Sequence, residues 1–206
     1  MIGHAIAEAA RAGFDAVTVV LSPAKQQLRL FLANNEFPLA VDTVVQPQAL
    51  GLGDAVLRSW RGEPVALLLP DDVVLSTDHW LSILAMHRRY AAAVLCLRLV
   101  PFETISRFGI ADCKGTRVVG LVEKPQPGAS DSNLAIFGRY VVTEQVIAGL
   151  RGLSVTGELE LTEGFAAAIV TPTGVRAVRF RGESYDCGTP DEYASSLARF
   201  PGRPAN

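Results

Sequence analysis

Hydrophobic and polar positions alternate along the chain in a way that predicts helices and strands in turn. Apolar residues recur at helical spacing from Ile2 to Ala12, and Gly13 follows where a helix would stop. The β-branched run Ala16–Leu21 predicts a strand. Ser22-Pro23 then marks a helix start, with the helix expected over residues 24–32. The chain therefore opens as helix, strand and helix.

The same alternation continues to the C-terminal end. We predict strands at 41–45, 65–69, 92–99, 110–112, 118–123, 134–140 and 174–180, and helices at 53–60, 77–90, 143–150, 159–169 and 191–200. The two strands that flank Lys114-Gly115 form a hairpin. Apolar strands without polar alternation indicate a sheet covered on both faces. We therefore expect an α/β fold, with a single domain over residues 1–200, a mixed, mostly parallel sheet flanked by helices, and a flexible tail at 201–206.

Composition and charge exclude several classes of partner. The chain has 206 residues, is 49% hydrophobic and carries a net charge of -2, so it has no strong basic field that would attract nucleic acid or an anionic membrane. No apolar run approaches the roughly 20 residues of a membrane span, and the N-terminus does not read as a signal peptide. Cys96, Cys113 and Cys187 are far apart and odd in number, which argues against disulfides and zinc. We expect a soluble protein of the cytoplasm.

Carboxylates follow two of the predicted strands. Asp71 and Asp72 come after the strand at 65–69, and Asp186 follows the strand at 174–180. In an open α/β sheet, ligands bind at the carboxyl ends of the strands. Each aspartate alone is explained as well by a turn. Two of them facing one crevice would hold a magnesium ion that carries substrate phosphates.

Two loops carry groups that suit a nucleotide and a sugar. Gln46 precedes Gly51-Leu52-Gly53, where glycines let the backbone approach a flat base and the glutamine amide matches the edge of uracil. Glu123-Lys124-Pro125 places an acceptor for sugar hydroxyls beside a cation for phosphate. A lone glycine pair is otherwise a loop and helix start, and a lone Glu-Lys is usually an exposed ion pair.

The order of these motifs resembles the bacterial UTP:glucose-1-phosphate uridylyltransferases over nearly the whole chain. The resemblance is carried by Gln46 with Gly51-Leu52-Gly53, Leu69-Pro70-Asp71, Phe108-Gly109, Glu123-Lys124-Pro125, Ser132 to Tyr140, Gly157 to Thr162 and Asp186-Cys187-Gly188. The related thymidylyltransferases differ around residues 133–140, so the resemblance favours a uridylyl donor. It implies a nucleotide-diphospho-sugar transferase fold of the Rossmann-like type. It also implies transfer of a uridylyl group from UTP to glucose 1-phosphate, which gives UDP-glucose and pyrophosphate, with Mg²⁺ as cofactor.

The resemblance also implies roles for individual residues. It assigns uracil contacts to Gln46 and Gly51, magnesium to Asp71 and Asp186, sugar contacts to Gly109 and Glu123, and the sugar phosphate to Lys124. Of these, Asp71, Lys124 and Asp186 are the expected catalytic residues. The roles of Asn133, Arg139 and Glu158 stay open, since Arg139 suits a structural ion pair equally well. The sugar-contacting residues do not distinguish glucose 1-phosphate from the 1-phosphate of another hexose or of a uronic acid. Members of this family often form dimers or tetramers, so the resemblance also allows a homo-oligomer.

The chain departs from this family at its N-terminus. Family members begin with a strand and a glycine-rich loop that carries an arginine, followed by a lysine, and these groups hold the triphosphate. Met1 to Ile6 instead aligns with the helix after that loop. We therefore expect impaired activity and, because the family's first strand lies inside the sheet, two strand edges without a partner.

Three explanations of this departure compete. The true protein could start further upstream, the chain could be a short paralogue, or it could be a decayed or trimmed piece. The paralogue would bind a UDP-sugar without turnover and serve as a regulatory or assembly partner. We favour the upstream start because the motif residues Gln46, Asp71, Glu123, Lys124 and Asp186 are all retained.

Overall fold

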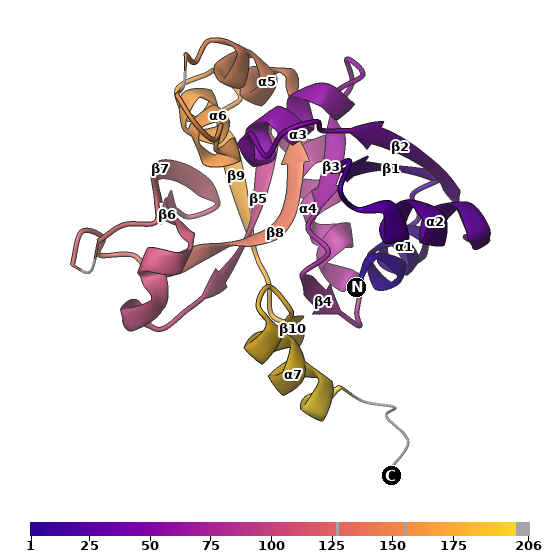
Figure 1. Ribbon diagram of the computed structural model, residues 1–206. Coiled ribbons are helices and arrows are strands. Elements are labelled where there is room, and N and C mark those ends of the chain that lie inside the picture. Colours follow the sequence, from indigo (N-terminus) through magenta and orange to yellow (C-terminus); the bar gives the residue numbers. More distant parts are fainter. Residues whose placement is uncertain (127, 155, 201–206) are drawn as a thin grey trace.

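The computed structural model describes residues 1–126, 128–154 and 156–200 (Figure 1). The helices are α1 (Ile2–Arg11), α2 (Gln26–Asn34), α3 (Gly51–Ser59), α4 (Asp78–Tyr90), α5 (Glu144–Arg151), α6 (Leu161–Ile169), α7 (Pro190–Arg199) and the 3-10 helix η1 (Phe102–Arg107). The strands are β1 (Ala16–Leu21), β2 (Ala40–Val45), β3 (Val65–Leu68), β4 (Asp72–Val74), β5 (Ala93–Leu99), β6 (Gly109–Lys114), β7 (Arg117–Glu123), β8 (Leu134–Val142), β9 (Val175–Arg179) and β10 (Ser184–Asp186). The predicted alternation is confirmed, and the tail predicted at 201–206 lies outside the described residues.

The largest sheet has the strand order β3-β8-β5-β9-β7-β6, and β6 also pairs with β8. The mixed α/β fold is confirmed, but the prediction of mostly parallel strands is wrong. Among the described strands, β1–β2 and β5–β9 are parallel, whereas the other pairs are antiparallel. The error has a physical origin. An apolar run indicates that both faces of a strand are buried, but it contains no information on whether the neighbouring strands are parallel or antiparallel to it.

Helices cover both faces of this sheet, and alternate residues of β5 pack against them. Leu95 and Leu97 belong to the core under α5 and α6, together with Phe165. Val94 and Cys96 point to the opposite face, where they pack in one cluster with Trp80 and Ile83 of α4. Because both faces are buried, β5 is apolar along almost its entire length. None of the described helices is both long and apolar enough to cross a membrane.

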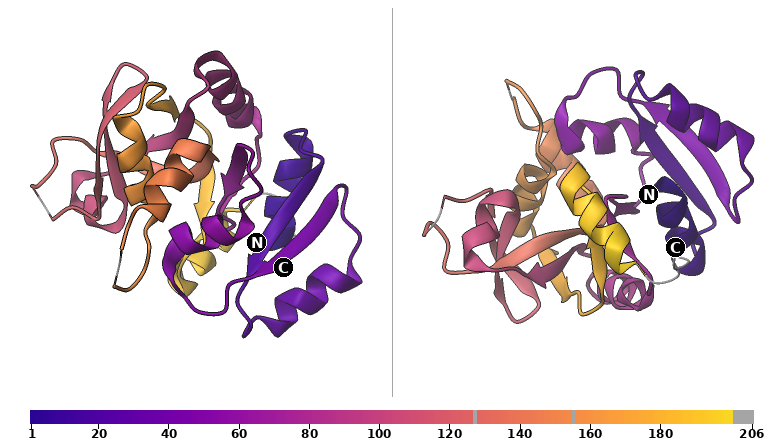
Figure 2. Two further views of the ribbon diagram at one scale, coloured as in Figure 1. Left: turned by 90° about the horizontal axis from the view of Figure 1, so that it is seen from above. Right: turned by 60° about the horizontal axis from the view of Figure 1, so that its bottom comes forward.

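Strands β1 and β2 form a parallel pair outside the six-stranded sheet, with α2 beside them (Figure 2). Within the described residues, β1 pairs only with β2 and β3 pairs only with β8. Each of these two strands therefore has one edge to which no other described strand is bonded. This part of the molecule is thinly packed, since α2 has no buried residue.

Two short strands, β4 and β10, were not predicted. They pair antiparallel, with Asp186 opposite Asp72 and Ser184 opposite Val74. Three-residue strands carry too little periodicity to be read from the sequence, and these two lie more than a hundred residues apart. Their pairing brings the segment around Asp186 to the end of β3, with α7 packed against β10 (Figure 1).

Candidate functional site

The two aspartates expected to hold magnesium lie side by side. Asp71 sits in the turn between β3 and β4, and Asp186 is the last residue of β10. The backbone N–H of Cys187 donates to the carbonyl of Asp71 at 2.8 Å, which fixes one segment on the other. A Cβ placed on Gly188 would lie 3.4 Å from Asp186 Oδ1 and 3.8 Å from Asp71 Oδ2. Oxygen atoms of both carboxylates therefore lie close to Gly188.

This donor set suits magnesium that arrives with phosphates. The described residues contain no group of three or more His, Cys, Asp or Glu side chains that could enclose a metal ion. Mg²⁺ is usually bound through one or two carboxylates, with substrate phosphates and water completing its octahedron. Asp71 and Asp186 are two carboxylates that lie near each other, which is the number that such a site requires from the protein.

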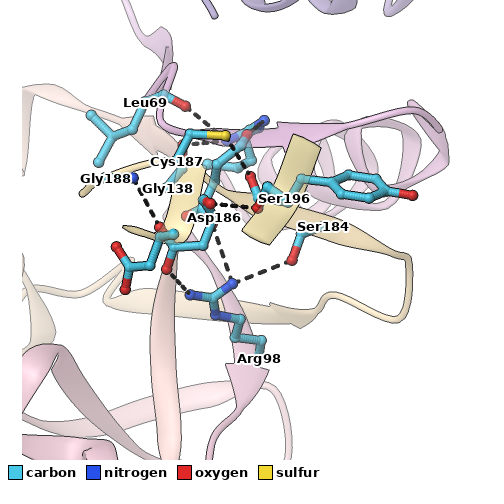
Figure 3. A network of polar contacts seen from close by, with 12 residues as sticks. Leu69, Arg98, Gly138, Ser184, Asp186, Cys187, Gly188 and Ser196 are labelled. Atoms are coloured by element: carbon cyan, nitrogen blue, oxygen red, sulfur yellow. Dashed lines mark hydrogen bonds and ion pairs between the residues drawn. The ribbon is translucent and has the colours of Figure 1, made fainter. Parts of the chain in front are cut away.

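Arg98, which the sequence analysis did not single out, lies against Asp186 and the neighbouring Asp72 (Figure 3). Its Nη1 atom is 3.2 Å from Asp72 Oδ1 and 3.3 Å from Ser184 Oγ, and Nη2 is 3.9 Å from Asp186 Oδ2. Burial raises the pKa of Asp72, and the charge of Arg98 partly opposes that effect. A single charged residue inside the apolar strand β5 was the signal that could have identified it.

A second cluster contains the expected sugar-contacting residues. Gly109 and Glu123 stand opposite each other in the β6–β7 hairpin. A Cβ on Gly109 would lie 3.0 Å from Glu123 Oε2 and 3.3 Å from the hydroxyl of Thr162. Thr162 Oγ1 donates to Glu123 Oε2 at 2.6 Å, so the carboxylate is held in place. The structure thus brings Gly109 and Glu123 together and adds Thr162 as an unpredicted partner.

Lys124 extends from the same hairpin. Its Nζ atom lies 3.4 Å from Glu160 Oε1 and 3.5 Å from Glu123 Oε1. The carboxylates of Glu160 and then Glu123 raise the pKa of the Lys124 ammonium. Since 56% of its side chain is exposed, the charged end is accessible to an anionic ligand. Glu160 therefore takes part in the cluster, whereas Glu158 is exposed and makes no polar side-chain contact within the described residues.

The third cluster contains the residues expected to contact uracil. Gln46 Nε2 donates to the carbonyl of Gly51 at 3.0 Å and to Asp54 Oδ2 at 2.9 Å. Gly51 has a φ of 88°, and a Cβ there would lie 2.5 Å from the carbonyl oxygen of Leu159. The glycine is therefore required for close packing of two backbone segments, a reason that its sequence neighbours did not reveal.

One segment of the chain links the second and third clusters. In segment 159–162, Leu159 packs on Gly51. The side chain of Glu160 contacts Lys124, and that of Thr162 bonds to Glu123. Burial raises the pKa of Tyr140, and the negative charges of Asp72, Glu123 and Asp71 add to the rise.

Arg139 holds the backbone on both sides of Asp71. Its Nε and Nη2 atoms bond both carboxylate oxygens of Glu8, at 2.8 and 2.6 Å. Nη1 donates to the carbonyl of Leu69 at 3.1 Å, and Nη2 donates to that of Asp72 at 2.7 Å. The alternative left open for Arg139, a structural ion pair, is the one that the structure shows.

Comparison with known proteins gives a consistent result. A family model described as nucleotidyl transferase matches residues 1–200. The UTP–glucose-1-phosphate uridylyltransferase of Escherichia coli K12 is 32% identical over 174 residues, which cover 76% of this chain and 57% of that protein. The enzyme of the same description from Komagataeibacter xylinus is 36% identical over 135 residues, or 62% of this chain and 47% of the relative. The chain thus spans about half the length of these curated relatives.

Solved structures agree with the fold. A UDP-glucose pyrophosphorylase complexed with UDP-glucose superposes with a TM-score of 0.85 at 24% identity, and covers 98% of this chain and 87% of that one. The UTP-bound UGPase from Acinetobacter baumannii has a TM-score of 0.80 at 28% identity, with 96% and 81% of the two chains covered. The arrangement of helices and strands around the three clusters is therefore one already seen in solved structures.

Proposed function

This chain belongs to the nucleotidyl transferase family, and from that premise we propose that it carries the substrate site of a UTP:glucose-1-phosphate uridylyltransferase. A phosphate oxygen of glucose 1-phosphate attacks the α-phosphorus of UTP, and the bond from that phosphorus to the oxygen bridging to the β-phosphorus breaks. Pyrophosphate leaves with the bonding electrons, and UDP-glucose forms. The nucleophile is already an anion, so no general base is needed. Positioning and charge neutralisation are then the protein's tasks.

The observation that carries the proposal is the meeting of Asp71 and Asp186 at Gly188. We assign the binding of Mg²⁺ to these two carboxylates. When bound, the ion supplies positive charge to the phosphates between which the bond breaks. Lys124, with its raised pKa and accessible ammonium, supplies a second positive charge for the sugar phosphate.

For the remaining roles we keep those that the family resemblance implies, and the geometry of the other clusters supports them. We assign uracil to Gln46 and Gly51, because the glutamine uses its NH₂ group on protein acceptors and keeps its amide oxygen for a base N–H. We assign the binding of sugar hydroxyls to Glu123 and Gly109. The hydroxyl of Thr162 orients the Glu123 carboxylate, and Gly109 beside it has no side chain to fill the space.

The free cysteines Cys96, Cys113 and Cys187 fit the proposed cytoplasmic location.

Binding of UDP-glucose in the presence of Mg²⁺, measured by calorimetry, tests these assignments. We expect Asp71→Asn and Lys124→Gln each to weaken binding by about 10- to 100-fold, since a hydrogen bond to a charged group contributes about 1.5–3 kcal/mol. Asp42→Asn and Lys114→Gln are matched controls, because both residues are exposed and lie outside the three clusters. Controls that weaken binding as much as the site variants would contradict the assignments.

Pyrophosphate release from UTP and glucose 1-phosphate separates the enzyme from a binding module. Magnesium-dependent turnover that Asp71→Asn abolishes supports the uridylyltransferase. Tight UDP-glucose binding without turnover supports the alternative of an inactive UDP-sugar-binding paralogue. A chain that is folded by circular dichroism and does not bind UDP-glucose refutes both.

A further inference from the structure

A hollow of about 550 Å³ lies where the parallel strands β5 and β9 end. Three arginines line it: Arg98 near the end of β5, Arg179 at the end of β9, and Arg181 two residues later. Gly182 and Ser184, which lead into β10, complete the wall together with apolar atoms of Leu99 and Phe180. The carboxyl ends of parallel strands are a common place for ligands in α/β proteins.

The positive charges around this hollow are poorly compensated. Arg179 and Arg181 form no ion pair with any carboxylate in the part of the chain that the structure describes. Glu183, the acidic residue of the same loop, instead accepts from the hydroxyl of Tyr185 at 3.4 Å. The chain as a whole has a net charge of -2, so this basic group is not the result of a generally basic protein.

Arg98 adds a third guanidinium group to the same place. Its Nη atoms contact Asp72, Ser184 and, at 3.9 Å, Asp186, but its Nε atom is buried and has no hydrogen-bond partner among the described residues. Guanidinium groups that lie close together repel each other, and two of these three have no carboxylate partner among the described residues. A ligand that brings several negatively charged oxygens into the hollow relieves this repulsion.

We propose that this hollow binds a phosphate-bearing anion through Arg98, Arg179 and Arg181, with the hydroxyl of Ser184 as an additional contact. Arginine suits this task because its planar fork donates two hydrogen bonds to one phosphate. The volume lies within the usual range for sites of small molecules, roughly 300–1,000 Å³. The inference goes beyond the proposed function, since none of the residues given substrate or metal roles lines the hollow.

The location connects such an anion to the carboxylate pair. Arg98 reaches from the hollow to Asp186, whose side chain also faces Gly188 (Figure 3). The shared chemistry, a phosphate oxyanion, is present both in free pyrophosphate and in the triphosphate of a nucleotide. The test therefore uses both compounds.

Calorimetric titration of the full chain with sodium pyrophosphate, and separately with UTP, both without magnesium, tests the proposal. We expect the double variant Arg179→Gln/Arg181→Gln to bind pyrophosphate at least about tenfold more weakly than the wild-type chain. The control is Arg29→Gln/Arg88→Gln, which removes the same charge from exposed positions of α2 and α4 and should bind pyrophosphate as the wild type does. Unchanged far-UV circular dichroism and melting temperature will establish that both variants are folded.

Each outcome bears on the proposal. Weaker binding of both compounds by the double variant indicates the triphosphate of a nucleotide as the ligand, and weaker binding of pyrophosphate alone indicates the free anion. Equal losses in the two double variants would mean general charge attraction and would overturn the proposal. Pyrophosphate binding that only Lys124→Gln weakens would place the anion in the proposed substrate site and would overturn it as well.

Discussion

Replacing Arg139 with methionine removes a charge from a buried network of hydrogen bonds and ion pairs around Glu8. The Arg139 side chain is 1% exposed and its partner carboxylate on Glu8 is 2% exposed. Glu8 also accepts from Trp80 Nε1 at 2.8 Å and lies 3.1 Å from His79 Nε2. Methionine matches the length of the arginine stem and fills its space, but it cannot donate to the carboxylate.

The expected cost follows from what the change leaves behind. Glu8 would stay buried without its cation, and the carbonyls of Leu69, Gly138 and Asp72 would each lose the hydrogen bond from Arg139. Breaking a buried ion pair by removing one partner costs about 3–5 kcal/mol. The whole stability of a domain is roughly 5–15 kcal/mol, so this is a large fraction of it. At about 2–4 °C per kcal/mol for a chain of this size, the melting temperature falls by roughly 6–20 °C.

Urea unfolding followed by circular dichroism, with Arg151→Met as the control, checks this value. Arg151 and Glu144 also form an arginine–glutamate pair, at 3.3 Å, but both side chains are 56% exposed. An exposed pair of this kind contributes about 0–1 kcal/mol. If Arg139→Met lowers the free energy of unfolding by no more than Arg151→Met does, burial of the Glu8–Arg139 pair does not make its loss costly, and the prediction is wrong.

Two further predictions concern acid and backbone packing. Burial alone would raise the pKa of Glu8, but hydrogen bonds from His79 and Arg139 outweigh it and lower this pKa below its ordinary 4.5. The ionised Glu8 therefore stabilises the fold fully above pH 4.5, and this stabilisation is lost as the pH falls through the lowered pKa. Urea unfolding at stepped acidic pH should show this loss in the wild type and not in Glu8→Gln, and parallel profiles would contradict the prediction. Gly51→Ala should lower the free energy of unfolding by at least about 1 kcal/mol more than Gly13→Ala does. Both positions have positive φ, but only a Cβ at Gly51 meets the backbone of Leu159. Equal urea midpoints for the two variants would show that this contact relaxes freely.

The local elements could be predicted because each one is encoded by its own residues. The β-branched run Ala16–Leu21 forms β1 with the predicted bounds, and the apolar periodicity after Met1 forms α1. The hairpin joined at Lys114-Gly115 was predicted as well, since Gly115 supplies the positive φ that its turn requires. Short-range sterics and the period of apolar residues determine such elements.

The members of the candidate site could be named, but not the reasons for their positions. Gly51 was expected to admit a base, yet its backbone packs on Leu159, more than a hundred residues away. Arg98 was not singled out, because one arginine in an apolar strand shows its function only when Asp72 and Ser184 stand beside it. Sequence order alone contains no information about these distances.

Local residue patterns encode the succession of helices and strands, the two-sided burial of β5 and the residue types available for phosphate, sugar and metal. Folding of the whole chain sets which strands run antiparallel, how β4 and β10 bring Asp186 near Asp71, and the pairing of Glu8 with Arg139 in the interior. The physical reason is that local propensity depends on neighbours in the chain, whereas charge pairing and close packing depend on contacts that exist only after folding.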